Sequence, residues 1–213
     1  MNVFLNSYLP LCSTKRGRDS THDFGLFPFV DGSCRREPDF EKLKPAITCL
    51  CRKQKLLPRL EEGDLVIYIT NKRRYYKKDP ERFFIGILEV EKLLASHEEA
   101  RQWYEEKGYV LSQNIICNKT EPLKSHFTHR ITRFKLSNGE ADIKLWNGSY
   151  RKRSRNDSLV AQAKVWNGFM ELNDPRKILD KELIKIFHRI PGVQNPPMLK
   201  EKEWDRFQNV FLR

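Results

Sequence analysis

Four stretches of the chain are rich in apolar side chains that favour β-structure, and each of them predicts a strand. They cover residues 3–8, 46–52, 65–70 and 83–91. The stretch 65–70, with the sequence Leu-Val-Ile-Tyr-Ile-Thr, has the continuous apolar character that is typical of a buried strand. Because only residues 71–82 separate the last two stretches, we predict a β-hairpin with a long tip.

The segment that follows these strands carries the signals of a helix start and a helix stop. Ser96 stands three residues before Glu99, which is the spacing of a capping box, where side chains bind the first free backbone N–H groups. Gly108 is a common helix terminator, so we predict a helix over residues 98–107. We interpret His97, in the first turn, as an exposed residue without a catalytic role.

The second half of the chain predicts shorter elements. A strand is expected over residues 131–136, before the tight-turn sequence Ser-Asn-Gly. Two near copies of the sequence Lys-x-Trp-Asn-Gly, at 144–148 and 164–168, predict strands that each end in an Asn-Gly turn. Helical spacing then favours two helices, over residues 178–187 and 200–208.

Residues 10–45 contain several glycines and prolines, so we expect a long loop there. A loop of this length in a compact domain usually serves a function. No Ser/Gly-rich linker and no shift of composition divides the chain, and we therefore predict a single domain over residues 1–213. The mixture of strands and helices favours the α+β class, with a mixed β-barrel and peripheral helices.

The chain is strongly basic, and most of its excess charge lies in two short clusters. Its 213 residues carry 40 Lys and Arg against 28 Asp and Glu, a net charge of +12. Residues 72–78 contribute five cations and residues 151–155 four, and without these nine the net charge falls to +3. Focused positive charge interleaved with tyrosines is typical of a surface that binds nucleic acid. Solvated loops that only keep the protein soluble, or an anionic membrane surface, are the alternatives.

The composition excludes two classes of protein. Aromatic residues make up 11% of the chain, too many for a disordered basic tail. No apolar run of roughly 18 residues or more predicts a transmembrane helix, and the first residues lack the apolar stretch of a signal peptide. We therefore expect a soluble cytoplasmic protein without a membrane partner.

The number and spacing of the cysteines favour a role in packing over disulfide bonds or metal binding. Their number is odd and no secretion signal precedes them, so a disulfide framework is not expected. A zinc site built from Cys117, His126 and His129 is an alternative, but the partner Cys-x-x-Cys of such sites is missing. We expect no metal and no cofactor. The five cysteines are Cys12, Cys34, Cys49, Cys51 and Cys117.

Two glycine patterns carry a resemblance to a known superfamily. A Gly-Asp pair at 63–64 leads into an apolar strand, and the next strand contains an internal Gly86. This pattern resembles the core hairpin of PUA-like barrels, which include the EVE, YTH and ASCH domains. Upstream, the segments 22–29 (His-Asp-Phe-Gly-Leu-Phe-Pro-Phe) and 32–34 (Gly-Ser-Cys) are similar to the nucleotide-modification-associated domains of that superfamily.

The resemblance covers residues 1–95 and implies a PUA-like barrel that binds or handles a modified nucleotide. It does not imply a reaction. Residues 110–213 show no comparable likeness, and we expect them to complete the barrel and to add the C-terminal helices. The basic loop at 72–78 departs from the family pattern.

Three aromatic residues close together in the sequence favour a pocket that holds an unpaired or flipped-out base. Gly25 permits a close backbone approach, and Pro28 stiffens the segment that carries the three phenylalanine rings. Asp23 could accept a hydrogen bond from the base. A turn residue is the alternative for this aspartate, as core packing is for each phenylalanine. The predicted base-binding residues are Asp23, Phe24, Gly25, Phe27, Phe29, Ser33, Thr48, Tyr68 and Asn71.

Basic residues near this pocket and in the two charged clusters are predicted to hold the phosphate backbone. They are Arg35, Arg36, Lys72, Arg73, Arg74, Lys77, Lys78, Arg151, Lys152, Arg153 and Arg155. We therefore predict a nucleic-acid-binding module that reads a modified base in DNA or RNA. A protein-interaction or ribosome-associated factor, whose basic face only steers encounters, is an alternative.

No catalytic motif stands out in the sequence. The chain has no phosphate-binding P-loop, no Gly-x-Ser-x-Gly, no His-Glu-x-x-His and no zinc-deaminase pattern. A nuclease or nucleotide-modifying enzyme on the same barrel stays an alternative, with His126, His129 and Arg130 as the acid, base and cation of a metal-free ribonuclease. We otherwise assign no catalytic residue.

Overall fold

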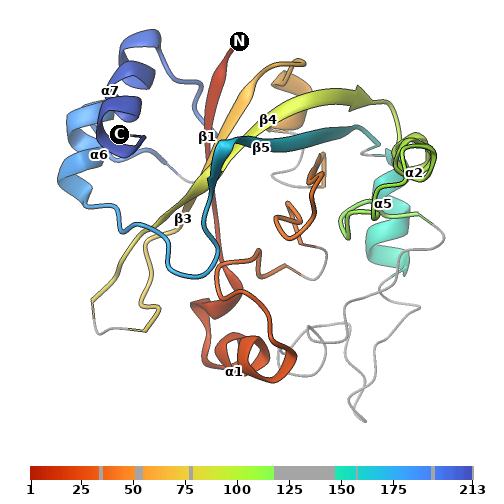
Figure 1. The fold of residues 1–213 in the computed structure, drawn as a ribbon, viewed down its shortest axis with the longest axis horizontal. Coiled ribbons are helices and arrows are strands. Elements are labelled where there is room, and N and C mark those ends of the chain that lie inside the picture. The colour runs from red at the N-terminus through yellow and green to blue at the C-terminus, as the bar shows by residue number, and fades with distance from the viewer. Residues whose placement is uncertain are drawn as a thin grey trace.

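The computed structural model describes residues 1–33, 36–50, 55–76, 79–117, 147–156, 158–192 and 195–212. A curled, mixed five-stranded sheet forms a half-barrel, and five α-helices lie around it in these ranges (Figure 1). The chain therefore has the α+β architecture that its sequence predicts. No helix in this part of the chain is long and apolar enough to cross a membrane.

The strands of the sheet are β1 (Val3–Tyr8), β2 (Ala46–Thr48), β3 (Leu65–Thr70), β4 (Phe84–Leu94) and β5 (Val160–Met170). Their order is β1-β3-β4-β5-β2, with β1 parallel to β3 and the other neighbours antiparallel. The predicted strands at β1, β3 and β4 and the β3–β4 hairpin are confirmed. β2 is shorter than the predicted strand 46–52, and the predicted strand 131–136 lies outside the described residues.

The helices are α1 (Lys15–Phe24), α2 (His97–Glu106), α5 (Lys152–Asn156), α6 (Asp180–Phe187) and α7 (Glu201–Phe211), with the short turns η1 (Leu11–Ser13), η3 (Leu57–Arg59) and the π-helical η4 (Asn147–Arg151). The helices predicted at 98–107, 178–187 and 200–208 are confirmed as α2, α6 and α7, with ends shifted by a few residues. The helical segment η4–α5 carries the second basic cluster.

Helix α1 occupies a region that the sequence predicts as a loop. Only Gly17 and Ser20 of this polar helix are buried, so it shows no apolar periodicity. Thr14 caps the first turn by accepting the N–H of Gly17 at 3.0 Å, and Gly25 ends the helix in the left-handed conformation. A Cβ on Gly17 would stand 1.8 Å from the carbonyl oxygen of Leu11, so the contact between α1 and η1 requires glycine.

The Asn-Gly pair of the second repeat does not form a turn. β5 runs through Asn167 and Gly168, whose φ angles are 47° and 76°, and the register with β4 shifts there. Such an irregularity holds extra residues without ending the strand. Gly86 lies opposite, where a Cβ would stand 2.4 Å from the carbonyl oxygen of Phe169. The predicted strand end in this repeat is therefore wrong, and in the first repeat the Asn-Gly pair begins η4.

Alternate side chains of the strands enter cores on opposite faces of the sheet. On one face Phe4 and Tyr68 pack with residues of the N-terminal third of the chain. On the other face Leu5 and Ile67 pack against α6 and α7. A smaller third cluster packs α2 against β2, β4 and β5. Because burial of apolar area stabilises a fold by roughly 25 cal/mol per Å², this third cluster holds α2 against the sheet, next to the candidate site.

Candidate anion-binding pocket

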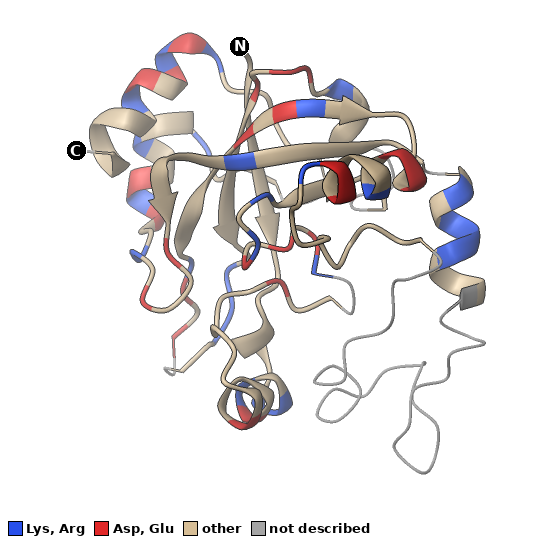
Figure 2. Cartoon of the chain, turned by 45° about the vertical axis from the view of Figure 1, so that its right-hand side comes forward, with Lys and Arg blue, Asp and Glu red and all other residues tan. Residues whose placement is uncertain are grey.

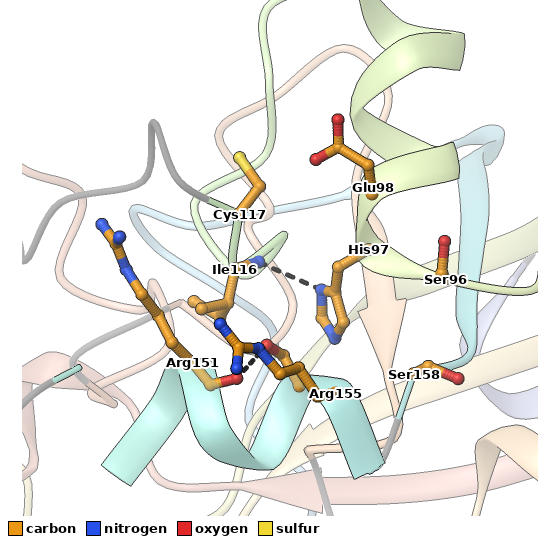
Figure 3. Close-up of a pocket in the computed structure, with 9 residues that line it drawn as sticks. Ser96, His97, Glu98, Ile116, Cys117, Arg151, Arg155 and Ser158 are labelled. Atoms are coloured by element: carbon orange, nitrogen blue, oxygen red, sulfur yellow. Dashed lines mark hydrogen bonds between the residues drawn. The ribbon is translucent and has the colours of Figure 1, made fainter. Parts of the chain in front are cut away.

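A pocket of about 390 Å³ lies between the start of α2, the segment that ends at Cys117 and the helical segment η4–α5 (Figure 3). Its volume is in the range of sites for small ligands. The described lining includes hydroxyl, imidazole, thiol, guanidinium and carboxylate groups. The polar lining residues are Ser96, His97, Glu98, Cys117, Arg151, Ser154, Arg155 and Ser158.

His97 is part of the pocket wall, which corrects the prediction that it is an exposed residue. Only 3% of it is exposed, and its Nδ1 accepts the N–H of Ile116 at 3.0 Å. A ring nitrogen that accepts this bond carries no proton, so the neutral imidazole has its proton at Nε2. The bond joins the start of α2 to the segment that carries Cys117 and holds two walls of the pocket together (Figure 3).

The cap predicted at the start of α2 is present. Ser96 Oγ accepts the N–H of Glu99 at 3.0 Å, and the Glu99 carboxylate accepts the N–H of Ala95 at 2.8 Å. Side-chain acceptors of this kind satisfy N–H groups that have no partner inside the helix. The cap therefore fixes the direction in which the chain enters α2 and holds Ser96 at the pocket.

Arg151 and Arg155 supply the positive charge of the pocket. They stand four residues apart on the basic segment η4–α5, which Figure 2 shows as a mainly blue helix, and both line the pocket. Ser154 Oγ donates to the carbonyl oxygen of Arg151 at 3.0 Å. Arg153 Nη2 donates to the carbonyl oxygen of Leu50 at 3.3 Å, which ties the segment to the chain after β2.

Glu98 is the acidic group of the described lining, and its charge is already offset. The carboxylate accepts hydrogen bonds from Arg101 Nε at 2.8 Å and Nη2 at 2.5 Å. Arg155, by contrast, has no carboxylate within ion-pair distance among the residues that the structure describes. Among the described lining residues, Arg155 therefore keeps a positive charge that suits an anion.

The other basic cluster is partly neutralised where the β3–β4 loop meets α6. Lys72 Nζ lies 2.5 Å from one carboxylate oxygen of Asp180, and Arg82 Nη1 lies 3.1 Å from the other. The hydrogen bond from Lys72 lowers the pKa of the Asp180 carboxyl below its usual value. The charge of Lys72 is therefore engaged inside the protein and contributes little to an exposed basic surface.

The structure describes two of the four remaining cations of this cluster. Arg73 and Arg74 are exposed, as a phosphate contact requires, and the backbone of Arg73 exchanges two hydrogen bonds with Glu81. Lys77 and Lys78 lie outside the described residues.

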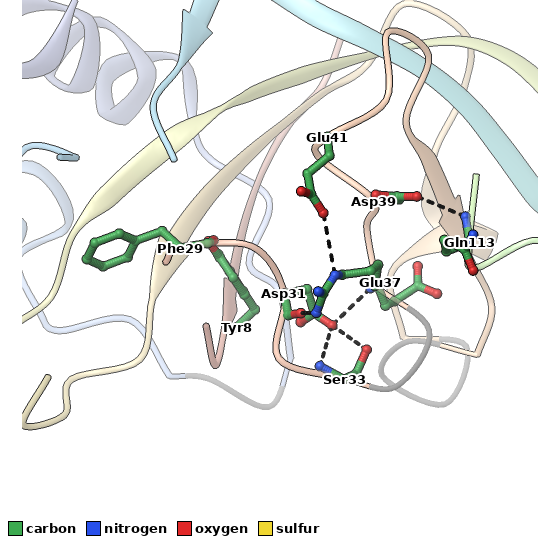
Figure 4. A network of polar contacts seen from close by, with 9 residues as sticks. Tyr8, Phe29, Asp31, Ser33, Glu37, Asp39, Glu41 and Gln113 are labelled. Atoms are coloured by element: carbon green, nitrogen blue, oxygen red, sulfur yellow. Dashed lines mark hydrogen bonds and ion pairs between the residues drawn. The ribbon is translucent and has the colours of Figure 1, made fainter. Parts of the chain in front are cut away.

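Arg36 is a structural residue instead of the expected phosphate contact. It is 2% exposed and adopts the left-handed conformation with φ 53°. Its Nη1 donates to the carbonyl oxygen of Asp31 at 2.8 Å, and its Nε lies 3.6 Å from the Glu41 carboxylate. Asp31 in turn accepts the N–H of Ser33 at 2.8 Å, so this predicted base-binding serine also belongs to the network (Figure 4). Arg35 lies outside the described residues.

Three of the predicted base-binding side chains are in the core and do not line an open pocket. Phe29, Thr48 and Tyr68 are at most 3% exposed. The Thr48 hydroxyl donates to Glu37 at 2.6 Å, and the Tyr68 ring packs edge-on against the Phe40 ring with centroids 5.0 Å apart. The alternative of ordinary core packing therefore describes these residues.

Two of the three phenylalanine rings of the predicted aromatic loop reach the surface. Phe24 is 37% exposed and Phe27 is 48% exposed, on either side of Gly25. Gly25 serves as the C-cap of α1, with φ 60°. Asp23 belongs to the last turn of that helix, and its carboxylate lies 3.0 Å from His22 Nδ1. The surface at the end of α1 therefore keeps the aromatic character that the sequence predicts.

Arg18 joins α1 to the loop that carries the first basic cluster. Its Nη1 donates to the carbonyl oxygens of Cys12 at 3.1 Å and of Tyr75 at 3.0 Å. Its guanidinium carbon lies 5.9 Å from the centre of the Tyr76 ring, a residue that is 60% exposed. Asn71, a predicted base contact, is half-buried, and its carbonyl oxygen accepts the Tyr75 hydroxyl. The structure thus places the loop between β3 and β4 next to α1.

The alternative zinc and ribonuclease sites lie outside the described residues, because they need His126, His129 or Arg130. The predicted packing role of the cysteines is confirmed for Cys12 and Cys49, which belong to the core. The thiol of Cys117 is also buried, but it lines the pocket. Burial raises the pKa of the Cys12 thiol to about 12.

The sequence predicts only the arginines of this pocket as binding residues. The arginines of η4–α5 were predicted as phosphate contacts, but His97, Cys117 and Ser158 were not singled out for binding. The capping box marks Ser96, whereas no local pattern marks the others. Comparisons of the chain with protein-family models, with curated proteins and with solved structures find no match.

Proposed function

We propose that this protein binds nucleic acid and that the segment η4–α5 holds the phosphate backbone. The observation that carries the proposal is the pair Arg151 and Arg155, which lie in one pocket on a segment with two further cations, Lys152 and Arg153. Within the described ranges, neither Lys152 nor Arg155 has a carboxylate partner. Their charge is therefore available to a polyanion.

The physical basis of such binding is the release of counterions from the phosphates, so affinity falls as salt concentration rises. Guanidinium groups add directed hydrogen bonds, because their planar fork matches two phosphate oxygens. The exposed Arg73 and Arg74 would extend this surface, whereas Lys72 is engaged by Asp180.

We extend the proposal to a PUA-like barrel that reads a modified or flipped-out base from a cytoplasmic nucleic acid. The curled mixed sheet supports the first part. The exposed rings of Phe24 and Phe27 support the second, since aromatic side chains stack on unpaired bases. In this proposal the buried Phe29 and Tyr68 support the aromatic surface from the core and do not touch the base.

A charge-matched pair of variants tests the proposed surface. We expect Lys152→Gln with Arg155→Gln to weaken binding to short labelled DNA or RNA strands by on the order of tenfold or more at moderate salt. The control, Lys181→Gln with Lys202→Gln, removes the same charge from exposed positions of α6 and α7 and should have a much smaller effect. Mobility shift or fluorescence anisotropy measures both.

Two results would overturn the proposal. Equal losses from the two double variants would mean that affinity follows net charge alone and not the segment η4–α5. A protein that binds neither DNA nor RNA at low salt would favour a protein-interaction factor instead.

A further inference from the structure

We infer that the ring of Tyr76, in the β3–β4 loop, stacks on an unpaired base of a single nucleic-acid strand. The inference rests on the proposed function and adds to it a stacking residue that lies neither on η4–α5 nor on the segment of the exposed phenylalanines. Its basis is an exposed aromatic ring that Arg18 holds from one face, on a loop that also carries exposed cations.

Two consecutive tyrosines of the β3–β4 loop have opposite environments. Tyr75 is 3% exposed, and its ring packs edge-on against the ring of Phe83 with centroids 5.6 Å apart. Its hydroxyl donates to the carbonyl oxygen of Asn71. Tyr76, by contrast, is 60% exposed. Tyr75 therefore anchors the loop in the core, whereas Tyr76 presents an aromatic side chain at the surface.

Contacts with α1 and η1 hold the exposed ring in place. The Arg18 guanidinium, which binds the carbonyl oxygens of Cys12 and Tyr75, lies over the Tyr76 ring at 5.9 Å from its centre, within the range of a cation–π contact. Burial, together with the nearby Cys12 thiol, raises the pKa of the Tyr76 hydroxyl to about 12. The hydroxyl end and one face of the ring are therefore covered, and the opposite face is the side on which a base could stack.

A ring that is fixed before binding suits this role. Tyrosine has few rotatable bonds, and the contact with Arg18 restricts them further, so little conformational entropy is lost when a base stacks on it. Every base has a flat aromatic face, so such stacking does not depend on sequence. We therefore expect Tyr76 to distinguish a strand with unpaired bases from one without bases, and not one sequence from another.

Four exposed cations lie on the two segments that meet at Tyr76. Arg73 and Arg74 precede it in the loop, and Lys15 and Arg16 belong to the first turn of α1. None of the four has a carboxylate partner within the described ranges. Cations in a first turn oppose the helix dipole, and the first turn of α1 contains no acidic residue. These charges do not stabilise the helix, and they are available to the phosphates next to a stacked base.

Two single strands of equal length and charge test the inference on the full chain. One is a homopolymer with its bases, and the other has abasic sites throughout, both made as DNA or as RNA, whichever the unmodified protein binds more tightly. Tyr76→Leu removes the flat ring but keeps an apolar side chain, and Tyr76→Phe is the matched control that keeps the ring. By fluorescence anisotropy, we expect Tyr76→Leu to weaken binding of the base-bearing strand on the order of tenfold, the size of one base stacked on an aromatic ring. Its affinity for the abasic strand, and the affinity of Tyr76→Phe for both strands, should match those of the unmodified protein.

The outcomes separate the inference from the proposed function. Equal affinity of the two variants for the base-bearing strand, with salt-dependent binding intact, overturns the stacking role and leaves nucleic-acid binding standing. A loss in Tyr76→Leu that is equal for both strands also overturns it, because stacking needs a base. If the unmodified protein binds neither strand at low salt, the proposed function fails as well. Tyr76 is largely exposed, so both variants should keep the urea midpoint of the unmodified protein. A lower midpoint in Tyr76→Leu alone would show that the ring serves the fold and would overturn the inference.

Discussion

Replacing Asp180 with asparagine should destabilise the protein and release the basic loop from α6. The Asp180 carboxylate bridges Lys72 at 2.5 Å and Arg82 at 3.1 Å. The side chain of Arg82 is only 7% exposed, so water cannot replace most of what the carboxylate provides. The bridge therefore links the β3–β4 hairpin to the C-terminal helices.

The contact with Arg82 sets the magnitude of the loss. A hydrogen bond to a charged group contributes about 1.5–3 kcal/mol to the free energy of unfolding. The contact with Lys72, whose side chain is 43% exposed, contributes at most about 1 kcal/mol. Because asparagine keeps the shape of aspartate and still accepts a neutral hydrogen bond, we expect Asp180→Asn to lower the unfolding free energy by about 2 kcal/mol.

The loss should also depend on pH. The hydrogen bond from Lys72 lowers the pKa of Asp180 in the folded protein, while an unfolded aspartate titrates near pH ~3.9. The stabilisation is therefore complete at neutral pH and is lost as the pH falls through ~3.9 towards the lower folded value. The unmodified protein and Asp180→Asn should differ most above about pH 5 and converge in acid.

Urea unfolding at neutral pH and near pH ~3 measures both effects. Asp174→Asn is the matched control, because Asp174 is an exposed residue shortly before α6 whose carboxylate makes no hydrogen bond within the described part of the chain. Equal midpoints for Asp180→Asn and Asp174→Asn at neutral pH would refute this account of the bridge. A difference that is just as large in acid would refute it too.

Two further pairs of variants test the helix α1 and the aromatic segment. Gly17→Ala should destabilise by roughly 1–3 kcal/mol, because the new methyl group would meet a carbonyl oxygen 1.8 Å away, and Gly192→Ala, with open space at its Cβ position, should not. Equal urea midpoints for these two variants would contradict the close contact of α1 with η1. Phe29→Ala should cost about 3–5 kcal/mol as a buried ring. Phe27→Ala should change the unfolding free energy by less than about 0.5 kcal/mol and selectively weaken binding to a strand with a modified base, so a large loss of stability or an equal loss for all strands would argue against the aromatic surface.

The strands could be predicted where local sequence decides the structure. β3 is a nearly continuous apolar run, β1 and β4 are rich in apolar side chains, and α2 begins with a capping box, so neighbouring residues carry the signal. α1 could not be predicted, because its stability comes from contacts made by polar residues and glycine. Thr14 caps it, Gly17 packs against η1, and Arg18 binds two carbonyl oxygens of other segments.

The candidate site could be predicted only from its charges. Arg151 and Arg155 stand out in the sequence, whereas His97 is buried and accepts a hydrogen bond from Ile116, 19 residues later in the chain. Arg36 shows the opposite effect, since a basic residue next to a predicted pocket is enclosed by Asp31 and Glu41. Long-range packing decides which cations remain available, and this information is not local in the sequence.

The salt dependence of the association constant for a single strand is the most direct test of nucleic-acid binding. Each phosphate contact contributes a slope of about −0.7 in a plot of log K against log salt concentration. The four cations of residues 151–155 therefore predict a slope of about −2 to −3 for the unmodified protein. Binding that follows this slope is the expected result, and a slope near zero, or no binding at low salt, would contradict the account.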